Sequence, residues 1–203
     1  MEINPGYFQF IPQYPVVRSF LQNPKVHLAI DDGRRWLIAH PQERYDAIIC
    51  NSTYFWRDHA SGLLSLEFLK MIQQHLNRGG IYYFNTTESA EAISTALHVF
   101  RYGLRVVNFL VVSDTPIQVN PVRWIATLRQ YQIDGRYLFD PNDPQAQRTL
   151  QQYAQFANSI NLPPTQFGLE ASDSLRRHYA NERPITDNNM GWEWVLDAPI
   201  PWN

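Results

Sequence analysis

The sequence predicts an α/β fold in which a mostly parallel sheet lies between two layers of helices. From Lys25 onward, short apolar runs alternate with longer amphipathic segments, and this alternation is typical of strand–helix–strand units. The length of 203 residues fits one domain with a single sizeable core. The 44% of hydrophobic and 14% of aromatic residues exclude a disordered or fibrous chain.

Four apolar runs have the length and the β-branched or aromatic content of buried strands. They occupy residues 26–30, 47–50, 81–84 and 105–112. A further strand is predicted at residues 122–128, where four apolar residues alternate with mostly polar neighbours. We expect this added strand to form an antiparallel hairpin at the edge of the sheet.

Three helices are predicted between the strands, over residues 34–39, 64–76 and 88–100. The second has one apolar stripe at helical spacing, formed by Leu64, Phe68, Met71, Ile72 and Leu76. The pair Gly79-Gly80 follows this stripe and is expected to end the helix.

The C-terminal third has a different composition, with more glutamine, proline and turn residues. Asp134-Gly135 predicts a turn, and residues 144–160 and 172–179 predict two helices that follow it. We therefore expect an α/β domain over residues 1–140 and a helical, turn-rich extension over residues 141–203 that packs on the same domain.

Charge and cysteine usage exclude several classes of protein. A net charge of -2 without blocks of like charge gives no basis for binding nucleic acid or a membrane surface. The apolar run at residues 106–112 is too short to span a bilayer, so we expect a cytoplasmic protein. The lone Cys50 and six histidines without ligand spacing give no pattern for a metal site.

Polar residues follow several of the predicted strands, where ligands bind in open α/β sheets. Glu2-Ile3-Asn4 opens the chain, Asp31-Asp32-Gly33 follows the run that ends at Ile30, and residues 51–56 follow Cys50. These three segments are the candidate ligand-binding loops.

Several of these segments, in this order and spacing, carry a resemblance to a known family. The chain resembles the spermidine and spermine synthases, which are aminopropyltransferases on a branch of the class I S-adenosylmethionine-dependent methyltransferase fold. The likeness spans about residues 1–128, with a weaker match near the C-terminus. It rests on residues 1–5, 23–26, 30–37, 45–49, 66–68, 76–80 and 185–188. It implies a three-layer Rossmann-like sheet.

The resemblance also implies a nucleoside site for S-adenosylmethionine or its decarboxylated form. In that family an acidic residue at the place of Glu2 holds the ribose hydroxyls, and Asp32 would accept from the adenine amino group. Gly33 would let the backbone approach the ligand closely, and Asn51 would line the same site. The alternative from the residues alone is that Asp31-Asp32-Gly33 is a solvated turn that caps the next helix.

The chain departs from the family after the strand that ends at Cys50. Where the family has an Asp, two small residues and a second Asp, this sequence has Asn51-Ser52-Thr53-Tyr54. An amide cannot act as a general base near neutral pH and carries no charge to hold a diammonium. We expect Asn51 to orient the attacking amine through its carbonyl. Tyr54 and His59 are further candidate catalytic residues, and no metal is needed.

Asn51 to Tyr54 also permits a second interpretation. An N-methyltransferase could orient its target nitrogen with Asn51, stack a planar substrate on Tyr54 and use His59 as a base. The alternative without chemistry is that the aromatic residues of this loop are core anchors and His59 lies on the surface.

The family's first strand and its glycine-rich nucleotide turn have no counterpart ahead of Glu2, so the expected fold is incomplete at its N-terminus. We expect the C-terminal part of a longer or split protein, which pairs with the missing N-terminal segment or forms a homodimer. The expected function is aminopropyl or related transfer to a small-molecule amine. A non-catalytic remnant or scaffold subunit is the third interpretation.

Overall fold

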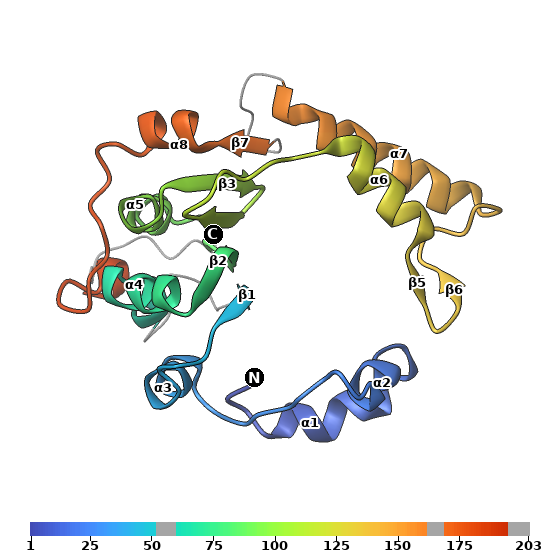
Figure 1. Cartoon of the computed structure of the whole chain (residues 1–203), viewed down its shortest axis with the longest axis horizontal. Helices are drawn as coiled ribbons and strands as arrows, with labels where there is room; N and C mark the ends of the chain where they lie inside the picture. The colour runs from blue at the N-terminus through green and yellow to red at the C-terminus, as the bar shows by residue number, and fades with distance from the viewer. Residues whose placement is uncertain (52–59, 162–168, 195–203) are drawn as a thin grey trace.

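The computed structural model describes residues 1–51, 60–161 and 169–194. Its main sheet has the strand order β1-β2-β4-β3-β7 (Figure 1). A separate two-residue hairpin pairs β5 with β6. The strands are β1 (Tyr45–Cys50), β2 (Leu76–Asn85), β3 (Tyr102–Val106), β4 (Phe109–Ser113), β5 (Gln132–Ile133), β6 (Arg136–Tyr137) and β7 (Leu169–Ala171).

The sheet is mixed. β1 and β2 are parallel, whereas β2 with β4, β4 with β3 and β3 with β7 are antiparallel. Before β1, Glu2 and Ile30 form an isolated parallel bridge, and the N-terminus lies beside β1, on the side away from β2 (Figure 1). The predicted α/β class is confirmed, but antiparallel pairings outnumber the expected parallel ones in the described strands.

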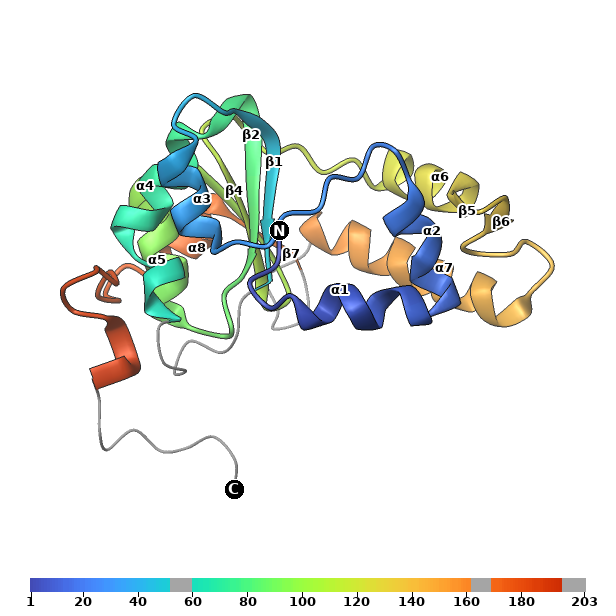
Figure 2. The same cartoon turned by 90° about the horizontal axis from the view of Figure 1, so that it is seen from below.

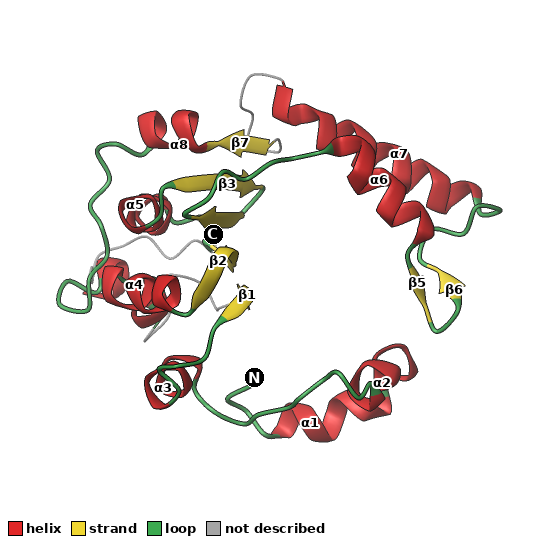
Figure 3. Cartoon of the chain, in the orientation of Figure 1, coloured by secondary structure: helices red, strands yellow, loops and turns green. Residues whose placement is uncertain are grey.

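Helices surround this sheet unevenly. Figure 2 shows α3, α4, α5 and α8 on one side of it, whereas α1–α2 and α6–α7 extend from the other side. Figure 3 shows the alternation of helices and strands along the chain. The α-helices are α1 (Gly6–Phe10), α2 (Pro15–Gln22), α3 (Gly33–Ala39), α4 (Leu66–Gln74), α5 (Ala90–Val99), α6 (Pro121–Gln130), α7 (Pro144–Asn158) and α8 (Ser172–His178).

The main core lies between the sheet and the helices α3, α4, α5 and α8. Alternate strand residues point to it, and the largest of them, Tyr82 and Phe84, stack with ring centroids 4.8 Å apart. Leu69 of α4 and Ala96 of α5 are fully buried against them. Burying an aliphatic or aromatic side chain of this size contributes roughly 1.5–3 kcal/mol, so this face carries most of the stability.

The opposite face of β1 and β2 is much less covered. Ile48 and Cys50 pack against the core, so Ala47 and Ile49 point to the other face, where Ile49 is 70% exposed. Tyr83 stacks on Phe109 on that face and is only half-buried. An apolar surface is therefore left open beside β1.

Helices α6 and α7 pack against one another around a second, smaller cluster. Ile125 and Leu150 are buried there together with Phe139. This pair bridges the predicted boundary at residue 140, while α8 returns to the main core through Leu175. The division at residue 140 stays a prediction. Within the described part of the chain, no helix combines the length and the apolar character needed to cross a bilayer.

Three strand predictions are wrong. Residues 122–128 belong to helix α6 because Asn120 caps its start, accepting from the backbone N–H of Arg123 at 2.9 Å, and Pro121 occupies the first turn. The expected edge hairpin is therefore absent at this position. The single strand predicted at residues 105–112 is divided into β3 and β4 by a turn in which Val107 has a φ of 59°.

The strand predicted at residues 26–30 does not form, since only Ile30 pairs, in the isolated bridge to Glu2. Other predicted elements hold with altered ends. The helix predicted to end at Gly79-Gly80 ends earlier, at Gln74, and both glycines lie in β2. A Cβ at Gly80 would lie 2.9 Å from the carbonyl oxygen of Asn77, so this position requires glycine. The turn at Asp134-Gly135 is confirmed, as are the helices of the C-terminal segment.

A buried carboxylate fastens the C-terminal strand to the sheet. Glu170 of β7 is fully buried at its side chain and pairs with Arg105 of β3 at 2.9 Å and with His178 of α8 at 2.5 Å. Ser174 donates a hydrogen bond to the same carboxylate at 2.6 Å. One acid thus joins β3, β7 and α8.

We expect Glu170→Gln to lower the free energy of unfolding by roughly 3 kcal/mol, because the largely buried Arg105 loses the charge of the carboxylate with which it pairs. The measurement is urea unfolding followed by circular dichroism. The control is Asp173→Asn at an exposed position of α8, which should change stability by a few tenths of a kcal/mol. Equal effects of the two variants would contradict this role.

Candidate functional site

The first candidate loop is built by the bridge between the N-terminus and residue 30. Glu2 N–H donates to the carbonyl of Ala29 at 3.0 Å, and Asp31 N–H donates to the carbonyl of Glu2 at 3.2 Å. A Cβ at Gly33 would lie 4.0 Å from Met1 Sδ. The structure therefore brings Glu2 together with Asp31-Asp32-Gly33, as the sequence predicts for the nucleoside site.

Within this loop the two aspartates have structural partners. Asp32 is the N-cap of α3 and accepts from the backbone N–H of Arg35 at 2.8 Å. Asp31 accepts from the Asp32 backbone N–H at 2.7 Å and pairs with the Arg35 side chain at 2.5 Å. Glu2 similarly accepts from the backbone N–H of Asn4 at 2.9 Å. The capping interpretation is thus confirmed, and the ligand-binding roles stay predictions.

Asn51 lies at the end of β1, in a second group. Its Oδ1 accepts from Nδ2 of Asn85, at the end of β2, at 3.0 Å. The Oδ1 of Asn85 accepts in turn from Nδ2 of Asn108 at 3.1 Å. Three amides therefore form one hydrogen-bonded row along the carboxyl ends of β1 and β2.

Among the described residues, no hydrogen bond or ion pair joins the Asn51 group to the Glu2 and Asp32 group. Tyr54 and His59, the other predicted catalytic residues, lie outside the described residues. The shared site that the sequence predicts for Asn51, Asp32 and Gly33 therefore stays a prediction.

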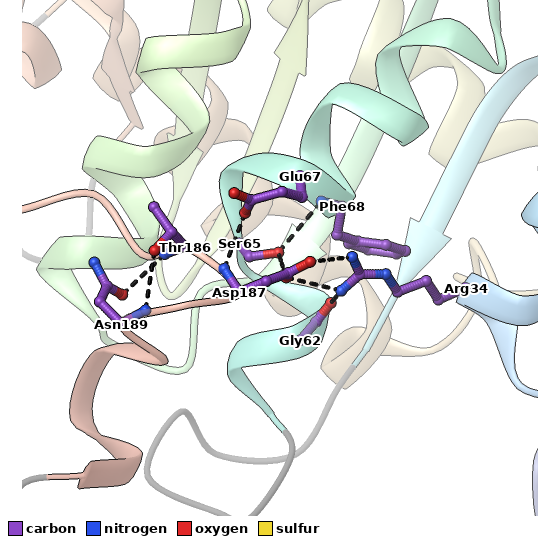
Figure 4. A network of polar contacts seen from close by, with 8 residues as sticks. All are labelled: Arg34, Gly62, Ser65, Glu67, Phe68, Thr186, Asp187 and Asn189. Atoms are coloured by element: carbon purple, nitrogen blue, oxygen red, sulfur yellow. Dashed lines mark hydrogen bonds and ion pairs between the residues drawn. The ribbon is translucent and has the colours of Figure 1, made fainter.

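Arg34, the second residue of α3, connects the Asp32 loop to the C-terminal segment. Its guanidinium pairs with both carboxylate oxygens of Asp187, one of them at 2.9 Å, and also donates to the carbonyl of Gly62 at 2.9 Å (Figure 4). Ser65, the N-cap of α4, donates to Asp187 at 2.6 Å. This cluster fixes the first turn of α3 beside residues 62–65.

Residues 185–193, here called the C-terminal strap, are held at further points. Asp187 N–H donates to Glu67 Oε2 at 3.0 Å (Figure 4). The carbonyl of Ile185 accepts from Leu66 N–H at 2.9 Å, and Glu193 accepts from the Ser61 N–H at 2.7 Å. The sequence gives residues 185–188 only a weak family likeness and gives Arg34 no role, because Arg34 and Asp187 are 153 positions apart and no local pattern joins them.

The Arg34–Asp187 pair shifts the pKa of both partners. The hydrogen bond from Arg34 lowers the pKa of the Asp187 carboxyl, against an opposing effect of burial. The hydrogen bond to Asp187 raises the pKa of Arg34. Both groups are therefore charged near neutral pH.

Two cavities lie on the described surface. A cavity of 210 Å³ is lined by Arg34, Asp187, Met190 and residues 61–62, and it is smaller than typical ligand pockets. A second, of 580 Å³, lies between β3, β7 and the start of α8, away from the predicted residues. The described residues contain no group of three or more acidic, His or Cys side chains that could hold a metal ion.

A comparison with solved structures identifies the fold. The structure is similar to the crystal structure of a probable spermidine synthase from Corynebacterium glutamicum ATCC 13032, with a TM-score of 0.54 and 13% identity. The chain has the Rossmann-like fold of that class I methyltransferase-type protein. The match covers 92% of this chain and 62% of the other, so this chain spans less than two thirds of that protein's length.

A second likeness is to MnmC2 from Aquifex aeolicus, with a TM-score of 0.39, 16% identity and coverage of 70% of this chain and 51% of the other. It is too distant to carry an argument. No protein-family model matches the sequence, and no curated protein is similar to it. The resemblance stated from the sequence is thus confirmed as a likeness of fold.

We expect Asp187→Asn to release the C-terminal strap and lower the stability by about 1 kcal/mol, the upper end for a partly exposed pair. Such a loss corresponds to a fall of the melting temperature by about 2–4 °C. Scanning calorimetry measures it, with Asp140→Asn on an exposed loop as the control. An unchanged melting temperature would show that the strap is held elsewhere.

The same pair predicts a pH dependence. Because the pKa of Asp187 is lower in the folded than in the unfolded chain, its stabilisation is complete above about pH 5, one unit above the ordinary carboxyl pKa of about 4, and is lost as pH falls through the lowered value. The stability difference between wild type and Asp187→Asn should therefore be constant above about pH 5 and should disappear in acid. A difference that persists in acid would contradict the electrostatic origin.

Proposed function

We propose that this chain forms the larger part of a transferase domain that binds S-adenosylmethionine or its decarboxylated form and transfers an aminopropyl or related group to an amine. The observation that carries this proposal is the bridged pair of loops at Glu2 and Asp31-Asp32-Gly33, in a chain with this fold. The backbone bridge places side by side two segments that carry the carboxylates of Glu2, Asp31 and Asp32, and carboxylates suit the hydroxyl and amino donors of a nucleoside.

The proposed chemistry needs alignment more than acid or base strength. The lone pair of the amine attacks the carbon attached to the sulfonium, a C–N bond forms and the C–S bond breaks. Sulfur keeps the bonding electrons and becomes a neutral thioether, and the new ammonium loses its proton to water. The residues of this chain would hold the nucleoside through Glu2 and Asp32 and orient the amine at Asn51.

Nucleoside binding is tested by calorimetric titration with S-adenosylmethionine, its decarboxylated form and methylthioadenosine. Asp32→Asn keeps the N-cap, because asparagine caps as well as aspartate, but removes the charge. We expect this variant to lose about tenfold in affinity, the value of one hydrogen bond to a charged acceptor, while Asp173→Asn binds as wild type. Tighter binding of S-adenosylmethionine would favour the N-methyltransferase alternative, and no binding by the folded chain would favour a scaffold.

We further propose that the sheet is completed by a strand and a helix from polypeptide outside residues 1–203. In the described residues, β1 pairs only with β2, so its other edge presents free backbone groups of the kind that recruits a strand. Ile49 of β1 is 70% exposed, and Ile30, in the bridge to Glu2, is 56% exposed. A strand would pair with β1, and a following amphipathic helix would cover Ile49 and Tyr83.

Hydrogen exchange on the chain, alone and joined to the polypeptide encoded upstream, tests this completion. We expect the β1 amides to exchange rapidly in the chain alone and to become protected in the extended chain. Ile49→Lys should remove this protection, whereas Ile38→Lys, at a site 62% exposed on α3, should not. Protection that instead rises with protein concentration, together with a doubled mass in ultracentrifugation, would identify a second copy as the occupant and overturn the proposal.

A further inference from the structure

The row of amides at the ends of β1 and β2 has a defined direction. Oδ1 of Asn85 lies 2.8 Å from the backbone nitrogen of Thr87. A backbone N–H can only donate, so the atom of Asn85 that faces it must be the oxygen. The amide nitrogen of Asn85 is then the atom that faces Asn51.

The donor role of the Asn85 nitrogen also determines which atom of Asn51 faces it. Because Nδ2 of Asn85 donates, the atom of Asn51 that receives it at 3.0 Å is the carbonyl oxygen. The NH₂ group of Asn51 is therefore turned away from Asn85, on a side chain that is exposed. At the carboxyl edge of the sheet, Asn51 therefore offers its NH₂ group as a donor, while its carbonyl oxygen already accepts from Asn85.

The turn after β2 holds Asn85 in place. Thr87 and Glu88 have φ angles of 54° and 67°, in the left-handed region that side chains other than glycine adopt at a cost. Thr86 fixes this turn, since its backbone N–H and its hydroxyl donate to the carbonyl of Asn108 at 2.9 and 2.7 Å. Strained backbone persists only where its surroundings determine it, so the orientation of Asn85 is part of the built structure.

We infer that Asn51 is a specificity-determining residue that donates a hydrogen bond to an acceptor atom of the amine substrate. A protonated alkyl diamine presents only donors, whereas a carbonyl or carboxylate oxygen accepts from an NH₂ group. The substrate class is therefore an amine that carries a carboxylate or amide oxygen, in place of a simple diamine. This inference rests on the proposed transferase function and assigns its second substrate.

A matched pair of probes tests it. Putrescine and γ-aminobutyrate share one aliphatic amine and differ in having a second ammonium or a carboxylate. We expect wild type to bind γ-aminobutyrate about tenfold more tightly than putrescine in calorimetry. Asn51→Asp should reverse this preference, because the aspartate still accepts from Asn85 and its other oxygen can accept from an ammonium. Asn142→Asp adds the same charge on an exposed loop and should leave the preference unchanged.

Both probes are titrated with and without methylthioadenosine, so that the two proposals fail separately. Loss of nucleoside binding alone would overturn the proposed function. Nucleoside binding combined with equal affinities for the two amines, tighter binding of putrescine, or binding of neither amine would overturn the role of Asn51.

Discussion

The rest of the structure depends on a sheet that is buried on one face only. Tyr82 and Phe84 of β2 are enclosed by α4 and α5. Tyr83, which lies between them in β2, and Ile49 of β1 point to the opposite face of the sheet. A strand whose apolar residues point both ways is typical of a sheet covered on both faces. In the described residues β1 pairs only with β2, and this edge beside the open face is where we propose that the sheet is completed.

Two parts of the candidate site are held by several hydrogen bonds. They are the strap on α4 through Ser65, Glu67 and Asp187, and the amide row from Asn51 to Asn108. The Glu2 and Asp32 loop is joined to that framework through Arg34. The cavity of 210 Å³ beside Arg34 is smaller than typical ligand pockets, and the strand that we propose to pair with β1 would add a further wall to the nucleoside site.

The sequence predicts well those features that depend on local patterns. The apolar stripe of α4 and the strands β1 and β2 follow from periodicity, and the Asp32 cap follows from residue type. Residues 122–128 show where alternation misleads, since the capping residue Asn120 and Pro121 decide for a helix. The ion pair of Arg34 with Asp187 and the pairing of Asn51 with Asn85 join residues far apart in the chain, and only the tertiary fold reveals such contacts.

The type of a residue does not determine the direction of the hydrogen bond that its side chain makes. Asparagine can donate or accept, so its presence at the end of β1 is compatible with opposite substrates. The backbone N–H of Thr87 removes this freedom because it has no acceptor function, and two amides transmit its direction to the edge of the sheet. An aspartate at residue 51 would accept from Asn85 and from a cationic substrate at once. In our proposal, asparagine in place of aspartate at residue 51 therefore changes the preferred substrate group from an ammonium to a carboxylate or amide oxygen. The hydrogen bonds among Asn51, Asn85 and Thr87 stay the same.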